Sequence, residues 1–368
     1  MGMLIASKRF EFAASHYYRH PDWTATQNET VFGKDAYGPH GHGHNFVMYA
    51  GFSGPLDPEN GMIVELSHVK RDVLADVLPR YDHYVLNDVP AFQKKLPTPE
   101  NMASVLLSEI QRVFSGRAYV PHHVHLIESP MSAATAYENG VIERHWQQAL
   151  GNAAFFGLWG SGEVTLGVSL AGKPDTQTWM IVSDIEVYRT LSDVAAKILG
   201  LSLPSSDMSA VDSMMAVVAD SGLLYDRVFI KTPKGTFSFG SKSSDVMAPL
   251  LSVLGSYTAT HRLDNPQFTL SENESCFGKC HRPHGHTFEV EISVASDQSL
   301  SEIERCLHRI LSEWDYQSLE THPDFAGRLC TTEHMVQVLA DKWEKRGVGT
   351  LKRLRLHETP NNRFSFRL

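Results

Sequence analysis

The alternation of apolar and polar residues predicts the same order of elements near both ends of the chain. Each end has a segment rich in β-branched and aromatic residues that predicts a strand, Phe46–Phe52 in one and Phe288–Val294 in the other. After the first of these, apolar residues recur at helical spacing in two stretches, Val69 to Leu78 and Met102 to Ile110. Two short strands follow, around 123–128 and 133–137. The pattern predicts a β-β-α-α-β-β unit, present twice.

The middle third predicts a weaker version of the same order. Its segments are strand-like runs at Val164–Leu170 and Thr178–Val182, helices at Val187–Leu199 and Val211–Val218, and closing strands at Arg227–Lys231 and Thr236–Phe239. One third of the 368 residues is about 123, the length of one unit. We therefore predict an α+β chain of three units, residues 1–140, 141–245 and 246–368, the second of them degenerate. An unrelated α/β insert in the middle is the alternative.

Composition narrows the class of protein. Hydrophobic residues make up 42% of the chain and charged residues 20%, as in ordinary globular proteins. No apolar run approaches the roughly 20 residues of a membrane helix, and no signal peptide is evident, so we expect no membrane partner. The net charge of −9 argues against a nucleic-acid partner. All four cysteines lie in the last quarter, which favours reduced thiols and a cytoplasmic location.

Chemically distinctive residues recur in one order in the first and third units and are missing from the second. The matching segments are Phe12-Ala-Ala-Ser-His16 and Tyr257-Thr-Ala-Thr-His261; Phe32-Gly-Lys34 and Phe277-Gly-Lys279; His42-Gly-His44 and His284-Gly-His286; Asp82-His83 and Asp315-Tyr316; Thr98-Pro-Glu100 and Thr331-Thr-Glu333; and Leu126-Ile-Glu128 and Leu356-His-Glu358. Shared order and spacing indicate an internal duplication.

The histidines predict two metal sites. Residues two apart in a strand project to one face, so His284 and His286 point the same way. His261, on a neighbouring strand, would complete a set of three. Three histidines with an open fourth position are typical of catalytic zinc. The first unit offers the equivalent set His16, His42 and His44, with His40 as a possible competitor.

Together these motifs resemble the 6-pyruvoyltetrahydropterin synthase and 6-carboxytetrahydropterin synthase superfamily, over about residues 8–138 and 255–368. The resemblance implies the T-fold, in which three β-β-α-α-β-β units close a twelve-stranded antiparallel barrel with helices outside. In the family two such barrels stack into a hexamer of units. A chain that holds three units would close its own barrel, and we expect it to form a homodimer that imitates this hexamer.

The resemblance also implies a lyase that acts on a pterin triphosphate, 7,8-dihydroneopterin triphosphate, with Zn²⁺ as cofactor. It assigns proton transfer to a cysteine paired with an Asp-His couple, and pterin binding to glutamates. Matched residue by residue, the catalytic groups are Cys280, His83 and Asp82, the pterin-binding carboxylates are Glu358, Glu333, Glu128 and Glu100, and the zinc ligands are His261, His284, His286, His16, His42 and His44.

Neither unit carries the complete family pattern. The third unit has Cys280, but its Asp315-Tyr316 lacks the family's histidine. The first unit has Asp82-His83, but Asp35 or Ala36 takes the cysteine position. The losses are complementary, so we expect one composite site per chain, with Cys280 facing Asp82-His83 across the junction of the third and first units. A pterin-binding protein without catalysis is the alternative.

The sequence leaves the product open. The Cys280-x-x-x-His284-Gly-His286 spacing resembles bacterial 6-carboxytetrahydropterin synthases of the queuosine route. The Gly-His-Gly-His-Asn run of the first unit resembles pyruvoyl synthases. We expect the product to be 6-carboxy-5,6,7,8-tetrahydropterin, with 6-pyruvoyltetrahydropterin as the alternative. Whether the first unit still binds zinc is also left open.

Overall fold

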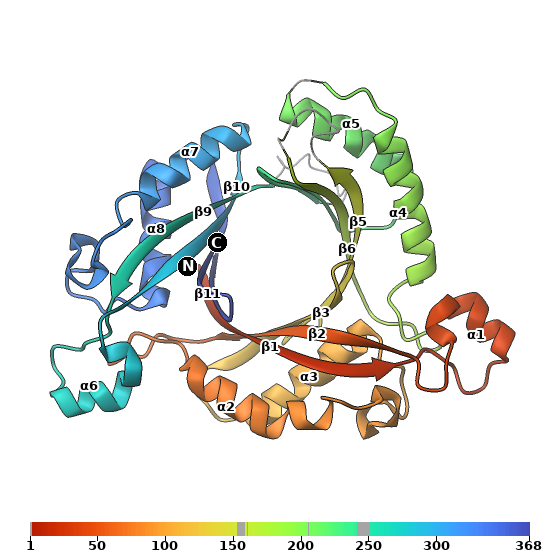
Figure 1. The fold of residues 1–368 in the computed structure, drawn as a ribbon, viewed down its shortest axis with the longest axis horizontal. Helices are drawn as coiled ribbons and strands as arrows, with labels where there is room; N and C mark the ends of the chain where they lie inside the picture. Colours follow the sequence, from red (N-terminus) through yellow and green to blue (C-terminus); the bar gives the residue numbers. More distant parts are fainter. Residues whose placement is uncertain (1, 153–158, 160, 205, 241–249) are drawn as a thin grey trace.

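The strands of the chain close into one antiparallel barrel. A computed structural model describes residues 2–152, 159, 161–204, 206–240 and 250–368. Within these residues twelve strands follow each other around the barrel in chain order, and the last strand pairs with the first. Figure 1 looks through the barrel and shows the helices packed around its outside. The predicted α+β T-fold barrel is confirmed.

Each third of the chain contributes four strands and two long helices. The first third contains β1 (Met3–His16), β2 (His42–Ser53), α2 (Leu66–Asp76), α3 (Pro99–Val113), β3 (Val120–Ser129) and β4 (Ser132–Tyr137). The second contains β5 (Ile142–Asn152), β6 (Glu163–Gly172), α4 (Asp184–Leu199), α5 (Asp207–Ala219), β7 (Arg227–Thr232) and β8 (Gly235–Gly240). The third contains β9 (Leu250–His261), β10 (His284–Ala295), α7 (Leu300–Leu311), α8 (Thr332–Arg346), β11 (Thr350–Thr359) and β12 (Asn362–Arg367).

Two further helices lie between the first two strands of the outer thirds. α1 (Ala25–Phe32) follows β1, and α6 (Leu270–Phe277) follows β9. Both begin with a capping box, at Thr24 and at Thr269, and both end at a glycine with positive φ. These matching caps place the residues after each helix in the same local geometry.

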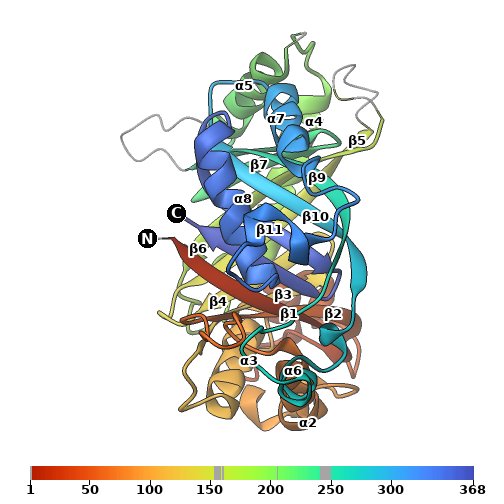
Figure 2. The ribbon, with the colours of Figure 1, turned by 90° about the vertical axis from the view of Figure 1, so that its left-hand side faces the viewer.

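Pairing of the terminal strands closes the barrel and joins the third unit to the first. Met3–Lys8 of β1 pairs with Asn362–Arg367 of β12. The two ends of the chain therefore lie side by side, in Figure 1 and again in the side view of Figure 2. Closure removes the exposed sheet edges that a single open unit would have.

The hydrophobic core lies between the barrel wall and the helices. Phe12 stacks on Phe46 with ring centroids 5.1 Å apart, and Tyr257 stacks on Phe288 at 4.8 Å in the third unit. In each case the histidine cluster continues the same strand face beyond the aromatic pair. The core therefore fixes the strands that carry the histidines.

One predicted strand of the middle third is wrong. Thr178–Val182 forms a turn and bend in which Trp179 has a φ of +57°. The N–H of Ile181 donates to the Glu100 carboxylate instead of to a strand. The first strand of this third is Ile142–Asn152, which lies outside the strands predicted from the sequence. The predicted boundary between residues 245 and 246 lies outside the described residues, and the unit boundaries stay a prediction.

Two simpler expectations concern the thiols and the membrane. All four cysteines are free thiols. Among the helices of the described residues, none has the length and apolar character needed to span a bilayer.

Candidate active site and metal centres

Two clusters of three histidines lie on paired strands. His16 of β1 is directly opposite His42 of β2, and His44 lies two residues further along that strand. The third unit repeats this register, with His261 of β9 opposite His284 of β10 and His286 two residues on. In each cluster the potential ligand nitrogens all lie within 4.8 Å of one another. The predicted triads are brought together, and His40 belongs to neither.

Each cluster is oriented for metal binding. The Nδ1 atom of buried His16 lies 2.9 Å from the carbonyl oxygen of Pro97, and Nδ1 of His261 lies 3.1 Å from that of Cys330. Such bonds direct the opposite nitrogen, Nε2, toward the cluster. In both residues Nε2 is buried without a hydrogen-bond partner.

Burial also favours the neutral imidazole that binds metals. It lowers the pKa of His16 to about 4, although Glu128 opposes the shift. It lowers the pKa of His261 as well. Three imidazoles, including a buried one with an unpartnered Nε2, suit a zinc ion with one open position. The residues of both clusters therefore fit the implied metal.

The loop after each short helix brings a different side chain to the two clusters. The N–H of Leu263 donates to the carbonyl of Cys280 at 2.9 Å, and the N–H of Tyr18 donates to the carbonyl of Asp35 at the same distance. Asp35 is therefore the counterpart of Cys280, and Ala36 is not. Its carboxylate lies 3.8 Å from Nε2 of His42. The first cluster thus has a carboxylate where the third unit has a thiol.

Cys280 is half-buried beside acidic groups. Burial is the main cause that raises the pKa of its thiol, and the carboxylates of Glu358 and Glu65 add to the rise. A thiol in this environment is mostly protonated at neutral pH. It therefore needs a proton acceptor from elsewhere to act as a base or nucleophile.

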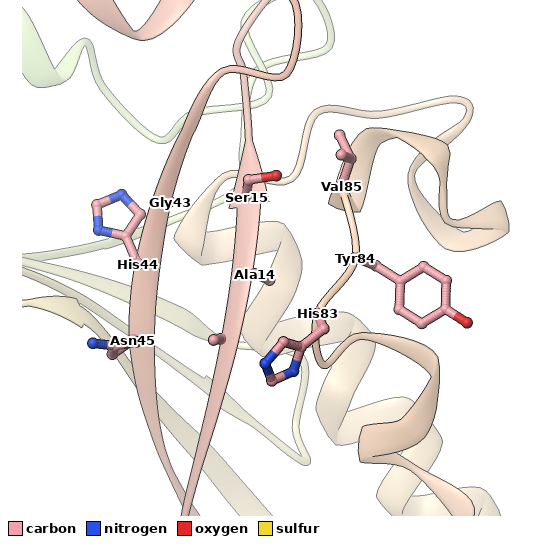
Figure 3. A pocket seen from close by; sticks show the side chains of 9 residues that line it. Ala14, Ser15, Gly43, His44, Asn45, His83, Tyr84 and Val85 are labelled. Carbon is pink, nitrogen blue, oxygen red and sulfur yellow. The ribbon is translucent and has the colours of Figure 1, made fainter.

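The Asp82-His83 pair lies along the free edge of β1. The Asp82 carboxylate accepts the N–H of Ala13 at 2.9 Å and lies 2.9 Å from Nδ1 of His83. His83 has a φ of +64°, and its side chain is 80% exposed. It lines a cavity of about 420 Å³ with residues of β1 and β2. Figure 3 shows His83 on the far side of β1 from His44.

The third unit preserves this backbone arrangement with a different side chain. Asp315 accepts the N–H of Thr258 at 2.8 Å, and the N–H of Tyr316 donates to Thr258. Tyr316 has a φ of +57° and is 84% exposed. A left-handed backbone conformation is costly for residues other than glycine. Its presence at both His83 and Tyr316 indicates that the surrounding structure imposes this backbone geometry in both units.

Within one chain, the contacts of Cys280 and of His83 lie along different stretches of β1. Glu358 and Lys279, which flank the thiol, act electrostatically on Lys8 as well. His83, by contrast, bonds to Ala13. Ala13 is five residues beyond Lys8 in β1, which is roughly 17 Å along the strand. The structure therefore does not bring this thiol and imidazole together in one chain.

The four predicted pterin-binding glutamates form two pairs at the junctions between units. Where the third unit meets the first, Glu333 accepts the N–H of Ile63 at 3.1 Å. Glu358 accepts Thr332 Oγ1 and Asn362 Nδ2, both at 3.1 Å. Its carboxylate lies 3.8 Å from Nε2 of His261. This junction therefore combines a metal-ligand cluster with two carboxylates.

The junction of the first and second units has the equivalent pair. Glu100 accepts the N–H of Ile181 at 3.2 Å. Glu128 accepts Ser132 Oγ at 2.5 Å and Tyr18 OH at 3.2 Å. The junction also contains Arg144 of β5, a residue outside every predicted motif, which is fully buried and lies 3.5 Å from Glu100. Its position in the alternation Ile142, Arg144, Trp146 is the one available signal, because it places a cation on a strand face turned to the core.

Burial raises the pKa of one glutamate in each pair, Glu333 and Glu100. It raises the pKa of Glu333 to about 8, and nearby Glu358 adds to the rise. It raises the pKa of Glu100 to about 7, against the opposing influence of Arg144. Both groups can therefore exchange a proton near neutral pH when donors are brought to them.

Glu333 predicts a specific pH dependence of stability. The unfolded carboxyl ionises near pH 4.5, whereas the folded one stays protonated up to about pH 8. The contribution of this group to the free energy of unfolding of the wild type therefore falls as pH rises from about 4.5 to about 8, because only the unfolded carboxyl ionises in this range. Glu333→Gln keeps a neutral acceptor for Ile63, so its stability relative to wild type should improve by about 3 kcal/mol between pH 5 and pH 8.

Urea denaturation of the metal-free chain at both pH values measures this difference. The control is Glu163→Gln, which changes an exposed carboxylate. A Glu333→Gln difference that is the same at pH 5 and pH 8 would contradict the protonated state of the buried group.

A comparison with known protein families matches the first and last thirds of the chain. The family description 6-pyruvoyl tetrahydropterin synthase matches residues 5–139 and 251–368, together more than half of the chain. These segments contain both histidine clusters. The chain belongs to the 6-pyruvoyl tetrahydropterin synthase family.

Individual relatives each cover about a third of the chain. A 6-pyruvoyl tetrahydrobiopterin synthase from Homo sapiens is 33% identical over 108 residues, 29% of this chain and 74% of that protein. A putative 6-pyruvoyl tetrahydrobiopterin synthase from Caenorhabditis elegans is 31% identical over 125 residues, 34% of this chain and 87% of that protein. A solved structure of C. elegans 6-pyruvoyl tetrahydropterin synthase covers 36% of this chain and 95% of its own, at 28% identity and a TM-score of 0.34.

Proposed function

We propose that the chain is a zinc-dependent 6-pyruvoyltetrahydropterin synthase acting on 7,8-dihydroneopterin triphosphate. The observation that carries the proposal is the junction of the third and first units, where the His261 cluster, Glu358 and the thiol of Cys280 come together. The relatives named above are pyruvoyl synthases, which favours this product over the carboxy product expected from the cysteine spacing. 6-Carboxytetrahydropterin synthase remains the second candidate on that spacing.

The residues of this junction divide the work. His261, His284 and His286 would hold the zinc, which acts as a Lewis acid on substrate oxygens. Glu333 and Glu358 present acceptors to the N–H groups of the pterin's amino-pyrimidinone edge, and a carboxylate accepts two parallel N–H donors well. Cys280 transfers protons at the side chain of the substrate once an imidazole accepts its own proton.

We further propose that this imidazole is His83 from a second chain. His83 and its neighbour Tyr84 are exposed, and the segment lies on the edge of β1 that pairs with no barrel strand beyond Lys8. Two stacked barrels would cover this edge and bring Asp82-His83 of one chain to Cys280 of the other. An Asp-His couple of this kind holds the imidazole in the tautomer that accepts a proton.

The dimer makes a direct prediction for mass in solution. A chain that closes its own barrel needs one partner to build the two-barrel particle. Light scattering of the full-length chain should therefore give twice the chain mass. A stable monomer or trimer of full-length chains would contradict the proposed arrangement, because neither can be built from pairs of stacked barrels.

Product analysis tests the function itself. Incubation of the zinc-loaded chain with 7,8-dihydroneopterin triphosphate should release triphosphate and form a pterin with a three-carbon dioxo side chain, without acetaldehyde. Acetaldehyde with a carboxylated pterin would establish the second candidate instead. Tight binding of the substrate without release of triphosphate would contradict both and leave a binding protein.

A further inference from the structure

The two junctions that carry paired glutamates can be matched residue by residue. Ile181 donates its N–H to Glu100 just as Ile63 donates to Glu333. The neighbouring hydrogen bonds match as well: Thr98 Oγ1 donates to Trp179 O at 2.9 Å, and Thr331 Oγ1 donates to Gly61 O at 3.0 Å. In each junction the start of a helix, α3 or α8, therefore faces an equivalent loop through equivalent hydrogen bonds. The two junctions can then be compared side chain by side chain.

Strand register identifies the counterpart of Arg144. Ala134 of β4 pairs with Arg144 of β5, and Phe364 of β12 pairs with Ala6 of β1. Ala134 and Phe364 correspond, because each also pairs with the leucine two residues before the site glutamate of β3 or β11. Arg144 therefore stands where the other junction has an alanine methyl group.

The helix starts supply the second difference. α4 begins at Asp184, three residues after Ile181, and α2 begins at Leu66, three residues after Ile63. Asp184 therefore corresponds to Leu66. The first junction has gained a buried arginine and its acidic partner together, where the other junction has two apolar residues.

Arg144 is fixed by hydrogen bonds to Asp184 and to the backbone, and its Nε faces Glu100 without a hydrogen bond. Its Nη2 donates to Asp184 at 2.9 Å, its Nη1 donates to the carbonyl of Ala133 at 2.9 Å, and its Nε lies 3.5 Å from Glu100. Burial would lower the pKa of Arg144, but the carboxylates of Asp184, Glu100 and Glu128 raise it above its usual value. The guanidinium is therefore a fixed cation that faces both site glutamates of the junction.

Side chains of the chain itself also occupy the space around Glu128 and the adjoining loop. Tyr18 donates its hydroxyl to Glu128, whereas its counterpart in the third unit is Leu263, which has no such group. Trp179 takes the place of Gly61 and packs on a cluster that includes Tyr18. By contrast, within the described residues Glu333 forms no ion pair with a cationic side chain.

We propose that Arg144 is a built-in ligand of the first junction, whose guanidinium takes the place of the amino-pyrimidinone edge of a pterin, so that only the junction of the third and first units binds substrate. This inference rests on the proposed function for the identity of the ligand. The chemistry is shared: a guanidinium and the amino-pyrimidinone edge are both planar and offer parallel N–H donors to carboxylates. A tethered donor excludes a free one by its effective concentration.

The first test counts ligands with pterin itself, 2-amino-4-oxopteridine, by calorimetric titration of the full-length chain. Wild type should bind one pterin per chain. Arg144→Ala/Asp184→Leu copies the other junction at the two positions of the buried ion pair and should bind two. The converse variant, Ala6→Arg/Leu66→Asp, should lose the one wild-type site, with at least about a 100-fold loss of affinity. Two sites in wild type would overturn the proposal.

The second test does not depend on pterin. Arg144→Ala leaves Asp184 and Glu100 without their cation and should have a lower melting temperature than wild type. Millimolar guanidinium chloride should raise that melting temperature, whereas equal sodium chloride should not. Wild type, with its own guanidinium in place, should show no such rise. A variant that responds equally to both salts would overturn the assignment of Arg144 as a ligand.

The two tests separate the possible failures. If wild type binds no pterin but guanidinium rescues Arg144→Ala, the proposed function fails and the built-in ligand stands. If the double variant gains no second site and guanidinium gives no rescue, the inference fails and the proposed function stands. If Arg144→Ala does not fold without guanidinium but folds with it, the rescue is itself the expected result.

Discussion

Replacing Cys280 with alanine is expected to lower turnover by about 10²–10⁴-fold while leaving the zinc content unchanged. The thiol is half-buried beside Glu358, and positioned proton transfer is worth that much in rate. His83→Ala should cause a similar loss, because a protonated thiol needs the imidazole as acceptor. The double variant should be little worse than either single one, since groups that act as a unit are not additive. Steady-state kinetics with parallel zinc analysis measures all three.

Matched substitutions keep this prediction specific. Cys276→Ala removes another thiol of the same helix and turn, and Tyr316→Phe changes the exposed counterpart of His83. Both should retain nearly full activity. Full activity in Cys280→Ala would remove the cysteine from the mechanism, and full activity in His83→Ala would remove the second chain from the site.

Replacing His284 with alanine is expected to remove one zinc ion per chain and to lower turnover by at least about 10³-fold, or roughly 4 kcal/mol. The change removes one of three imidazoles that lie within ligand distance of each other. His42→Ala is the matched variant, because His42 occupies the same register in the first cluster. It should also lower the zinc content and yet leave turnover within about threefold of wild type, since Arg144 closes that junction.

Elemental analysis and kinetics of the two variants decide between the clusters. Unchanged zinc in His284→Ala would contradict the ligand assignment. Equal losses of turnover in His284→Ala and His42→Ala would show that both clusters are catalytic and would contradict the single site.

Much of the fold and of the histidine clusters follows from short-range patterns. Side chains two apart share a strand face, so His42 and His44 could be paired from sequence, and the duplicated order identified His16 as the third member. The helices α4 and α5 were predictable from apolar spacing alone. These features are local, and local periodicity determines them.

The remainder depends on contacts between residues far apart in the chain. Ile142–Asn152 is too polar to be recognised as a strand from its own residues. It forms a strand because it pairs with β4 and β6, which are contacts that the local pattern does not reveal. Asp35 could be distinguished from Ala36 only by the backbone bond from Tyr18. Arg144 contacts Glu100 and Asp184, each about 40 residues away, so no motif announces it.

The location of His83 shows the same limit at the level of assembly. The sequence predicted that Asp82-His83 and Cys280 share one site across the junction of the third and first units. The backbone bond from His83 to Ala13 places it on an exposed edge instead. The shared site therefore stays a prediction, which in the proposed dimer a second chain would fulfil.

Mixing two inactive variants tests the central claim most directly. Cys280→Ala and His83→Ala should each have very low turnover alone, but a dimer with one chain of each would retain one intact site, with Cys280 from one chain and His83 from the other. After unfolding and refolding an equimolar mixture with zinc, half of the dimers are mixed, and each has one of its two sites. Turnover should therefore recover to about one quarter of refolded wild type. No recovery, in a sample whose mixed dimers are verified by mass, would contradict a site shared between two chains.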